Sequence, residues 1–327
     1  MSQTQTRRSF LSMTALAGAA SLLERRGWAD EAALETTTVR FSKAPVICFA
    51  PQYICEALLR AEGFNDVVYV NTTPATAEED LGSGKFDFGS HLSLDHAMAI
   101  DRGLPITIVT GVHAGCYELF AHEGIRSIGD LKGKRIGAES ILLSLMAAYV
   151  GLDPKRDLNL VENRATEPLE LFAEGKLDAY LAFPPENQEL HARKAGHVIL
   201  RTAVDRPWSQ YFCCMLAANR EYVARYPVAT KRVIRAVLKA ADLCASKPEV
   251  AARLIVEGGF TQRYDYALQT LAENPYTAWR EYDAEDTLRF YALRLHELGM
   301  IKSTPQQIIA NGTNWRFLDE IKRELKA

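Results

Sequence analysis

Histidine and cysteine are the side chains whose types and spacing in this sequence could carry out chemistry. His113 precedes Cys116 by three residues, and His91 and His96 lie in the same region of the chain. A thiol next to an imidazole can act as a nucleophile. The sequence, however, contains no G-x-S-x-G, H-E-x-x-H or G-x-G-x-x-G motif. We therefore predict no catalytic residues, and we interpret His96, on a helix expected at 92–102, as structural.

The cysteines of the 327-residue chain show no metal-binding pattern. No C-x-x-C pair is present, and the spacings match no zinc motif. Cys213 and Cys214 are neighbours in an apolar run, which favours simple burial. We therefore predict neither a metal site nor a cofactor, and the sequence leaves open whether any cysteines form a disulfide. The six cysteines are Cys48, Cys55, Cys116, Cys213, Cys214 and Cys244.

Ligand binding is the second kind of chemistry that the residues allow. Short apolar runs alternate with amphipathic runs, which is typical of an α/β protein with doubly wound sheets. Ligands bind beyond the carboxyl ends of such strands, so the loops at 42–52, 90–92 and 111–116 should meet at one crevice. A pocket there needs polar groups and aromatic walls. The candidate ligand-binding residues are Phe49, Gln52, Tyr53, Ser90, His91, His113, Cys116, Ser140, Phe183, Glu186, Trp208 and Tyr211.

The stretch from Ser127 to Ser140 has the pattern of a strand that leads into a helix. It reads S-I-G-D-L-K-G-K-R-I-G-A-E-S, with a strand expected at 135–138 and a helix at 141–150. The free N–H groups and the positive dipole end of such a helix favour an oxygen-rich ligand. Ser140 stands at the N-cap position, where it either caps the helix or donates to a ligand.

Part of this stretch, D-L-K-G-K-R-I-G, resembles the segment that opens the second lobe in periplasmic substrate-binding proteins of ABC importers. The closest branch is the one for sulfonates, nitrate and thiamine-pyrimidine precursors. The runs G-K-F-D-F-G-S at 84–90, I-T-I-V-T at 106–110 and E-G-K-L-D-A at 174–179 are similar to the family's elements and follow its order. The resemblance covers nearly the whole mature chain.

The resemblance implies a two-lobe periplasmic-binding-protein fold of type II, each lobe a doubly wound sheet with flanking helices. Residues 38–112 with 214–327 would form lobe one, and residues 113–213 would form lobe two. The long C-terminal helices would complete lobe one. Such a protein is a monomer that closes over a small molecule and presents it to an inner-membrane ABC permease with its ATPase. We expect the hinge at about 111–117 and 208–216.

Charge limits the ligand and the partners. The net charge is −3, and it becomes −6 without the four arginines and one glutamate of residues 1–29, which argues against nucleic-acid binding. Lys43 and Arg206 are the cations near the expected rim, whereas Glu139 and Glu186 would oppose a multiply charged anion. Among a sulfonate, another organic monoanion and a pyrimidine-like heterocycle, we favour a neutral heterocycle or a monoanion, and we disfavour nitrate.

The N-terminus has the features of an export signal. T-R-R-S-F-L at 6–11 matches the twin-arginine pattern, and a mildly apolar stretch at 11–23 follows it. Small residues around Gly27 and Ala29 predict cleavage after Ala29, which makes 1–29 a twin-arginine signal peptide. No cysteine lies near this site, so we expect no lipid anchor and a protein that is free in the periplasm.

Two alternatives stay open. The fungal-type thiamine-pyrimidine synthase shares the fold and uses a pocket rich in histidine, cysteine and iron. Only the F-C-C-M run at 212–215 is similar to its dense cysteine run, and an export signal contradicts a cytosolic biosynthetic role. A ligand sensor for a membrane receptor would use the same two lobes, and gene neighbours would separate it from a transport protein.

Overall fold

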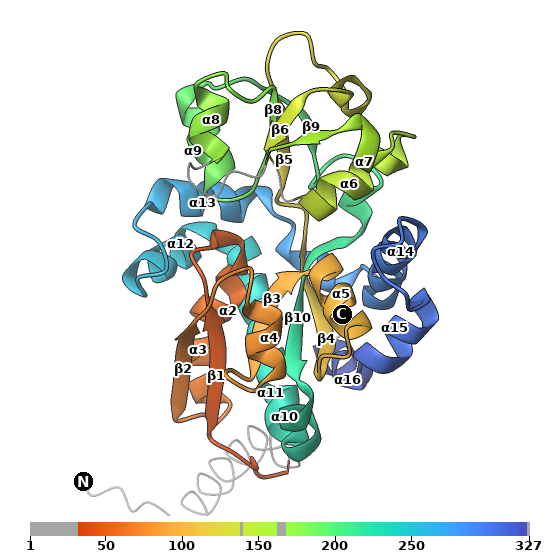
Figure 1. Ribbon diagram of the computed structural model, residues 1–327. Coiled ribbons are helices and arrows are strands. Elements are labelled where there is room, and N and C mark those ends of the chain that lie inside the picture. Colours follow the sequence, from red (N-terminus) through yellow and green to blue (C-terminus); the bar gives the residue numbers. More distant parts are fainter. Residues whose placement is uncertain (1–31, 138–139, 162–167, 326–327) are drawn as a thin grey trace, which may run out of the picture.

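Two five-stranded sheets, each flanked by helices, form the two ends of an elongated molecule (Figure 1). The computed structural model describes residues 32–137, 140–161 and 168–325. The expected signal peptide at 1–29 therefore lies outside the described residues, as do the side chain of Ser140 and all of Glu139. We call the first sheet with its helices lobe one, and the second sheet with its helices lobe two.

The sheet of lobe one has the strand order β2-β1-β3-β10-β4. Strand β1 is parallel to β2 and β3, whereas β10 is antiparallel to both β3 and β4. Every residue of β3, β4 and β10 is buried, because helices cover both faces of the sheet. The strands are β1 (Thr38–Lys43), β2 (Asp66–Asn71), β3 (Phe88–Leu92), β4 (Ile106–Ala114) and β10 (Phe212–Asn219).

The sheet of lobe two is smaller and has the order β7-β6-β8-β5-β9. Strand β6 is parallel to β7 and β8, and β5 runs antiparallel between β8 and β9. Each sheet therefore holds one antiparallel strand in its interior, β10 in lobe one and β5 in lobe two. The strands are β5 (Glu118–Ala121), β6 (Arg135–Gly137), β7 (Asn159–Leu160), β8 (Ala179–Ala182) and β9 (His197–Arg201).

Helices cover the sheets, and the long C-terminal helices surround lobe one as expected (Figure 1). Helix α11 buries its apolar face in the main core. No helix among the described residues is both long and apolar enough to cross a bilayer. The helices of lobe one are α2 (Ala50–Ile54), α3 (Glu56–Ala61), α4 (Ala77–Gly82), α5 (Ser93–Asp101), α10 (Arg220–Arg225), α11 (Pro227–Ser246), α12 (Pro248–Glu257), α13 (Tyr264–Glu273), α14 (Ala284–Glu297), α15 (Pro305–Gly312) and α16 (Arg316–Leu325). Those of lobe two are α6 (Ser140–Tyr149), α7 (Pro154–Asp157), α8 (Pro168–Ala173) and α9 (Glu186–Arg193), and short 3₁₀ helices lie at Ile47–Phe49, Ile128–Leu131, Trp208–Gln210 and Tyr276–Arg280.

The chain crosses between the lobes twice, after β4 and before β10. The two crossings are joined at Thr202, whose Oγ1 accepts hydrogen bonds from the backbone N–H groups of Cys116 (3.1 Å) and Tyr117 (2.9 Å). Gly115 has a φ of +62°, and a Cβ at this position would lie 2.3 Å from the Cα of Ala203. The crossings pack too closely for any side chain at this glycine.

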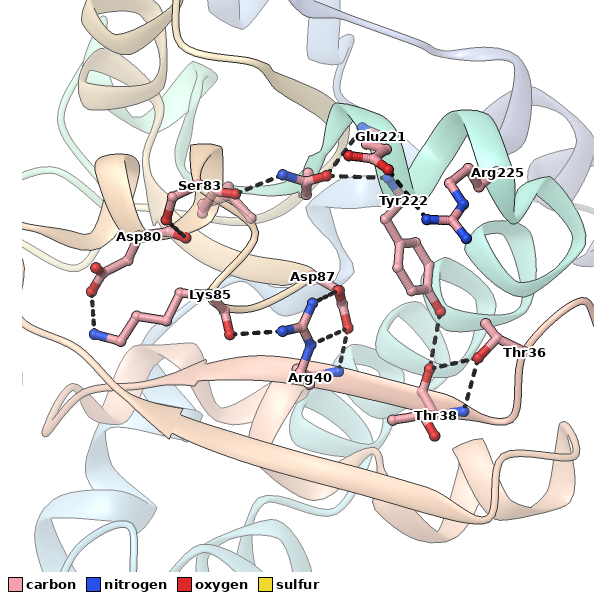
Figure 2. Close-up of polar contacts among 12 residues, drawn as sticks. Thr36, Thr38, Arg40, Asp80, Ser83, Lys85, Asp87, Glu221, Tyr222 and Arg225 are labelled. Atoms are coloured by element: carbon pink, nitrogen blue, oxygen red, sulfur yellow. Dashed lines mark hydrogen bonds and ion pairs between the residues drawn. The ribbon is translucent and has the colours of Figure 1, made fainter.

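Polar contacts fasten the end of lobe one that lies away from lobe two, as Figure 2 shows. Arg40 on β1 pairs with Asp87, with Nη2 and Oδ1 2.6 Å apart. The hydroxyl of Tyr222 on α10 donates to the carbonyl of Thr38 at 3.4 Å. The first strand is thus tied both to the segment before β3 and to the helix that follows β10.

The structure corrects several expected boundaries. The loop expected at 90–92 belongs instead to strand β3, so Ser90 and His91 lie inside the strand and not beyond its end. The loop expected at 42–52 contains the 3₁₀ helix Ile47–Phe49 and the first residues of α2. Strands β5 and β10 were not expected. All four residues of β5 and all eight of β10 are buried, so neither strand shows the alternation of apolar and polar residues that marks a half-buried strand. The first sheet includes Ala114 and Phe212, and the lobe boundaries at 112/113 and 213/214 stay predictions.

Candidate functional site: the cleft between the lobes

A cavity of about 550 Å³ lies between the two lobes. Lobe one contributes the loop after β1, the segment between β2 and α4, strand β3 and one face of α5, and lobe two contributes α9 and the strands next to it. The site is therefore at the carboxyl ends of β1, β2 and β3, where open α/β sheets bind ligands. Six of the candidate residues line this cleft, namely Phe49, Ser90, His91, Cys116, Phe183 and Glu186.

Aromatic rings form much of the wall. Phe49 stands on the lobe-one side, whereas Tyr117, Tyr180 and Phe183 stand on the lobe-two side. The rings of Tyr117 and Phe183 are 5.6 Å apart between centroids and inclined by 43°. Rings on both sides suit a planar ligand, which can stack against one wall while the other closes over it.

A buried ionic cluster stands behind the lobe-one wall. Nδ1 of His96 lies 3.0 Å from a carboxylate oxygen of Glu78, and Nε2 donates to the carbonyl of Met215 at 3.0 Å. His91 donates from Nδ1 to Glu78 at 2.9 Å and lies 3.2 Å from Asp95. Burial alone would raise the pKa of Glu78, but the two imidazoles, chiefly His96, hold that pKa well below its usual range.

Other carboxylates line the cleft. Glu79 pairs with Arg102 at 3.0 Å, and Glu186 accepts a 2.5 Å hydrogen bond from the hydroxyl of Tyr180. Together with Glu78 and Asp95, the described lining residues carry four carboxylates and one guanidinium. Glu79 is paired with Arg102, and Glu78 with the imidazoles of His91 and His96.

Two candidate residues outside the lining support it from behind. Gln52 is fully buried, donates from Nε2 to the carbonyl of Ser42 (2.9 Å), and accepts from the N–H of Ser90 (2.8 Å). The hydroxyl of Tyr53 donates to the carbonyl of Ala44 at 2.7 Å. Ser42, Ala44 and Ser90 line the cleft, so Gln52 and Tyr53 fix its surface. The Oγ of Ser90 is buried and has no hydrogen-bond partner among the described residues, which leaves it available to a ligand.

Thiols and one imidazole form the floor of the cleft. The donor atoms of Cys48, His113 and Cys116 all lie within 4.8 Å of one another, and Cys116 Sγ is 3.3 Å from Cys213 Sγ. Cys48, Cys116 and Cys214 line the cleft, whereas His113 is fully buried. Burial would lower the pKa of His113, but the sulfur of Cys48 outweighs it and raises this pKa to about 9. All six cysteines are free thiols.

The two aromatic residues of the second crossing lie elsewhere. Trp208 is buried between Tyr149 of α6 and Phe290 of α14, with centroid distances of 5.8 Å to each. Tyr211 stacks on Phe290 at 4.0 Å. Neither lines the cleft, because the crossing turns both rings toward α14, where they pack the joint between the lobes. The side chain of Ser140 lies outside the described residues.

Sequence reasoning missed several lining residues. Asp95, Met98 and Arg102 line the cleft from α5 and its end, and their spacing of three and four residues is one helical face. That spacing was a usable signal. Cys48 and Glu78 gave none, because only the folded chain brings them to His113 and His96.

Comparison with known proteins agrees with this architecture. A family model described as NMT1/THI5 like matches residues 60–251. A protein of Brucella abortus named as a binding protein is 25% identical over 199 residues, which is 59% of this chain and 62% of that protein. A 4-amino-5-hydroxymethyl-2-methylpyrimidine phosphate synthase of Saccharomyces cerevisiae is 24% identical over 209 residues, or 58% of this chain and 60% of the synthase. The chain thus spans about 60% of the length of these curated relatives.

Solved structures resemble nearly the whole chain. The periplasmic nitrate-binding protein NrtA from Synechocystis PCC 6803 has a TM-score of 0.76 at 12% identity, over 90% of both chains. The periplasmic aliphatic sulphonate binding protein SsuA from Escherichia coli has a TM-score of 0.69 at 18% identity, over 84% of this chain and 92% of that one. The fold is therefore that of the periplasmic binding proteins of ABC import systems, as the sequence predicted.

Proposed function

The chain belongs to the NMT1/THI5-like family, and from that premise we propose that it is the solute-binding component of an ABC importer. It captures a small organic molecule between its lobes and delivers it, unaltered, to an inner-membrane permease. The observation that carries this proposal is the cleft itself, whose walls come from both lobes. A solute that contacts both walls favours the closed arrangement, which a permease can recognise.

Export to the periplasm by the twin-arginine route is part of the same proposal. Its support is the T-R-R-S-F-L run at 6–11 and the periplasmic proteins that share the fold. We expect the protein in periplasmic extracts to begin at Asp30. A chain that keeps Met1 and stays in the cytosol would contradict this part of the proposal alone.

The solute that fits best is a planar nitrogen heterocycle, neutral or cationic, such as an aminopyrimidine. Rings on both walls, Phe49 from lobe one and Tyr117 and Phe183 from lobe two, offer stacking to a flat molecule. The carboxylates of the lining accept hydrogen bonds from ring or amino N–H groups, and the Oγ of Ser90 adds a small polar contact. Nitrate or a sulfonate would meet four carboxylates with one guanidinium in return.

The test is direct identification of the solute. Small molecules released from protein purified from its native periplasm would be identified by mass spectrometry, and their binding measured by calorimetry beside an aminopyrimidine, an alkanesulfonate and nitrate. We expect a heterocycle to bind and to reduce the radius of gyration in X-ray scattering. The proposal fails if no member of a broad library compacts the protein.

One substitution tests whether the solute binds in the cleft. Phe183→Ala removes a ring that lines the cleft and should weaken binding about two- to tenfold, the value of one stacking contact. Tyr264→Ala removes an exposed ring of α13 that does not line the cleft and should leave the affinity unchanged. Equal affinities for wild type and Phe183→Ala would show that the solute binds elsewhere.

A synthase is the second candidate, because the yeast relative is a pyrimidine phosphate synthase. Incubation of the protein with iron and pyridoxal phosphate, followed by a search for a pyrimidine product, separates the two candidates. An importer component returns its solute intact and yields no product. A product formed by the purified chain would replace transport with catalysis.

A further inference from the structure

Three donor atoms from distant parts of the sequence meet at the floor of the cleft. Cys48 belongs to the 3₁₀ helix after β1, His113 to β4 and Cys116 to the first crossing, and their donor atoms are mutually within 4.8 Å. Their exposed fractions are 2%, 0% and 5%. Two sulfurs and an imidazole nitrogen at this separation are the ligand types of thiophilic metal ions.

A hydrogen bond to the backbone fixes the orientation of the His113 ring. Its Nδ1 faces the carbonyl of Gly115 at 2.8 Å, and because a carbonyl can only accept, Nδ1 carries the proton. The Nε2 atom is buried and has no hydrogen-bond partner among the described residues. A donated N–H on one ring nitrogen is the arrangement that orients histidine ligands in metal proteins, and the sulfur of Cys48 is the group that acts on the imidazole from within the cluster.

We infer that Cys48, His113 and Cys116 form a binding site for a thiophilic d¹⁰ metal ion, Zn²⁺ or Cu⁺. Two thiolates neutralise Zn²⁺, so the loaded site adds no net charge to a buried region. Tetrahedral zinc places such donors about 3.5 to 3.8 Å apart. The donor atoms, which lie within 4.8 Å of one another, therefore have to approach by no more than about 1.3 Å. The two thiol protons leave for solvent as the ion binds.

A metal ion can reach this site from solvent through the cleft. Cys48 and Cys116 both line the cavity, so an ion from solvent can reach them without unfolding of the chain. The fourth coordination position is then open to water or to a donor atom from the cleft. This inference goes beyond the proposed transport of an organic solute, because it depends only on the floor residues and not on the aromatic walls.

The first test measures metal binding by the full reduced chain. After removal of metal with a chelator, we expect one equivalent of Zn²⁺ per chain in equilibrium dialysis, and Co²⁺ should give the thiolate-to-metal absorption of a cysteine site. A parallel titration with Cu⁺ against a copper chelator decides which ion binds more tightly. Absence of stoichiometric binding by both ions would overturn the inference.

Substitutions identify the ligands. Cys48→Ser and Cys116→Ser should each weaken binding by at least about 100-fold, more than loss of an outer hydrogen bond costs a metal site. Cys244→Ser is the matched control, because Cys244 is equally buried but is not part of the cluster. Unchanged affinity in both cluster variants would also overturn the inference.

A third measurement needs no variant. In the wild-type chain, Zn²⁺ should slow alkylation of Cys48 and Cys116 more than that of Cys55 and Cys244, as read by peptide mass spectrometry. A chain isolated with a Cys116–Cys213 disulfide that binds no metal even after reduction would contradict the site. These assays contain no organic solute, so their failure leaves the transport proposal untouched, and a failure of solute binding leaves the metal site untouched.

Discussion

At the scale of single residues, the cleft depends on buried polar groups that never face the solute. Gln52 spans two strands, since its amide bonds both Ser42 at the end of β1 and Ser90 within β3. Its own side chain is inaccessible. The amide therefore sets the distance between two lining residues, and its contribution should appear in both stability and solute affinity.

Replacement of Gln52 by leucine leaves the carbonyl of Ser42 and the N–H of Ser90 without these partners in a buried region. We expect a loss of about 1 to 3 kcal/mol in the free energy of unfolding, measured by urea denaturation, together with weaker solute binding. Gln306→Leu, at an exposed position of α15, should change neither quantity. Similar unfolding midpoints for the two variants would show that the amide is not a structural bridge.

Glu78 should give the protein a pH-dependent stability. Its pKa in the folded protein is held below the ordinary value of 4.5, chiefly because His96 outweighs the effect of burial. A depressed carboxyl pKa stabilises the fold above the unfolded pKa, and this stability disappears as the pH falls toward the folded value. Glu78→Gln should therefore cost about 1 to 3 kcal/mol at pH 7, with a smaller difference from wild type below about pH 4.5.

The control for this prediction is the neighbouring Glu79→Gln. Its partner Arg102 and Glu79 itself are about half exposed, and such pairs contribute less than about 1 kcal/mol. Unfolding free energies of both variants between pH 3 and pH 8 provide the check. A Glu78→Gln curve parallel to that of wild type would mean that His91, His96 and Asp95 compensate for the missing charge.

At the scale of elements, the two crossings act as one joint because Gly115 lets them touch. Gly115→Ala must place a methyl group 2.3 Å from the Cα of Ala203 at a φ of +62°. Gly133 has a similar φ of +71°, and a Cβ at this position would have no atom within 4 Å. Gly133→Ala should therefore lose only the about 1 to 2 kcal/mol that a left-handed backbone costs a residue with a side chain. We expect Gly115→Ala to lose clearly more stability than Gly133→Ala and to alter solute-induced compaction in scattering. Equal losses of stability in the two variants would show that the crossings can move apart to accommodate the methyl group without destabilising the protein.

The sequence predicted those elements whose pattern is local. The apolar run at 106–110 and the long C-terminal helices, α11 among them, were found because a continuous apolar run and a helical period are both visible within one element. The antiparallel strands β5 and β10 were missed because their existence depends on neighbours far away in the chain. The site shows the same division. Ser90 and His91 were candidates because a loop was expected at 90–92, and they line the cleft from within β3 instead. The meeting of Cys48 with His113 exists only in three dimensions.

At the scale of the whole molecule, the lobes also touch away from the crossings. The hydroxyl of Tyr266 on α13 donates to the carboxylate of Glu189 on α9, and Arg263 lies 3.8 Å from the same carboxylate. Helix α13 belongs to lobe one and α9 to lobe two, so this contact stabilises the arrangement of the lobes seen here. An arrangement in which the lobes separate must break it.

Tyr266→Phe removes the hydroxyl and keeps the ring. The lost hydrogen bond contributes about 0.5 to 1.5 kcal/mol, which changes the ratio of the two arrangements about two- to tenfold. A solute that binds between the lobes must supply the difference, so its affinity should fall by the same factor while the free protein becomes more extended in X-ray scattering. Tyr264→Phe alters an exposed ring on the same helix and should change neither measurement. If Tyr266→Phe keeps wild-type affinity and dimensions, the contact is equally present in both arrangements, and the balance between them is set at the crossings alone.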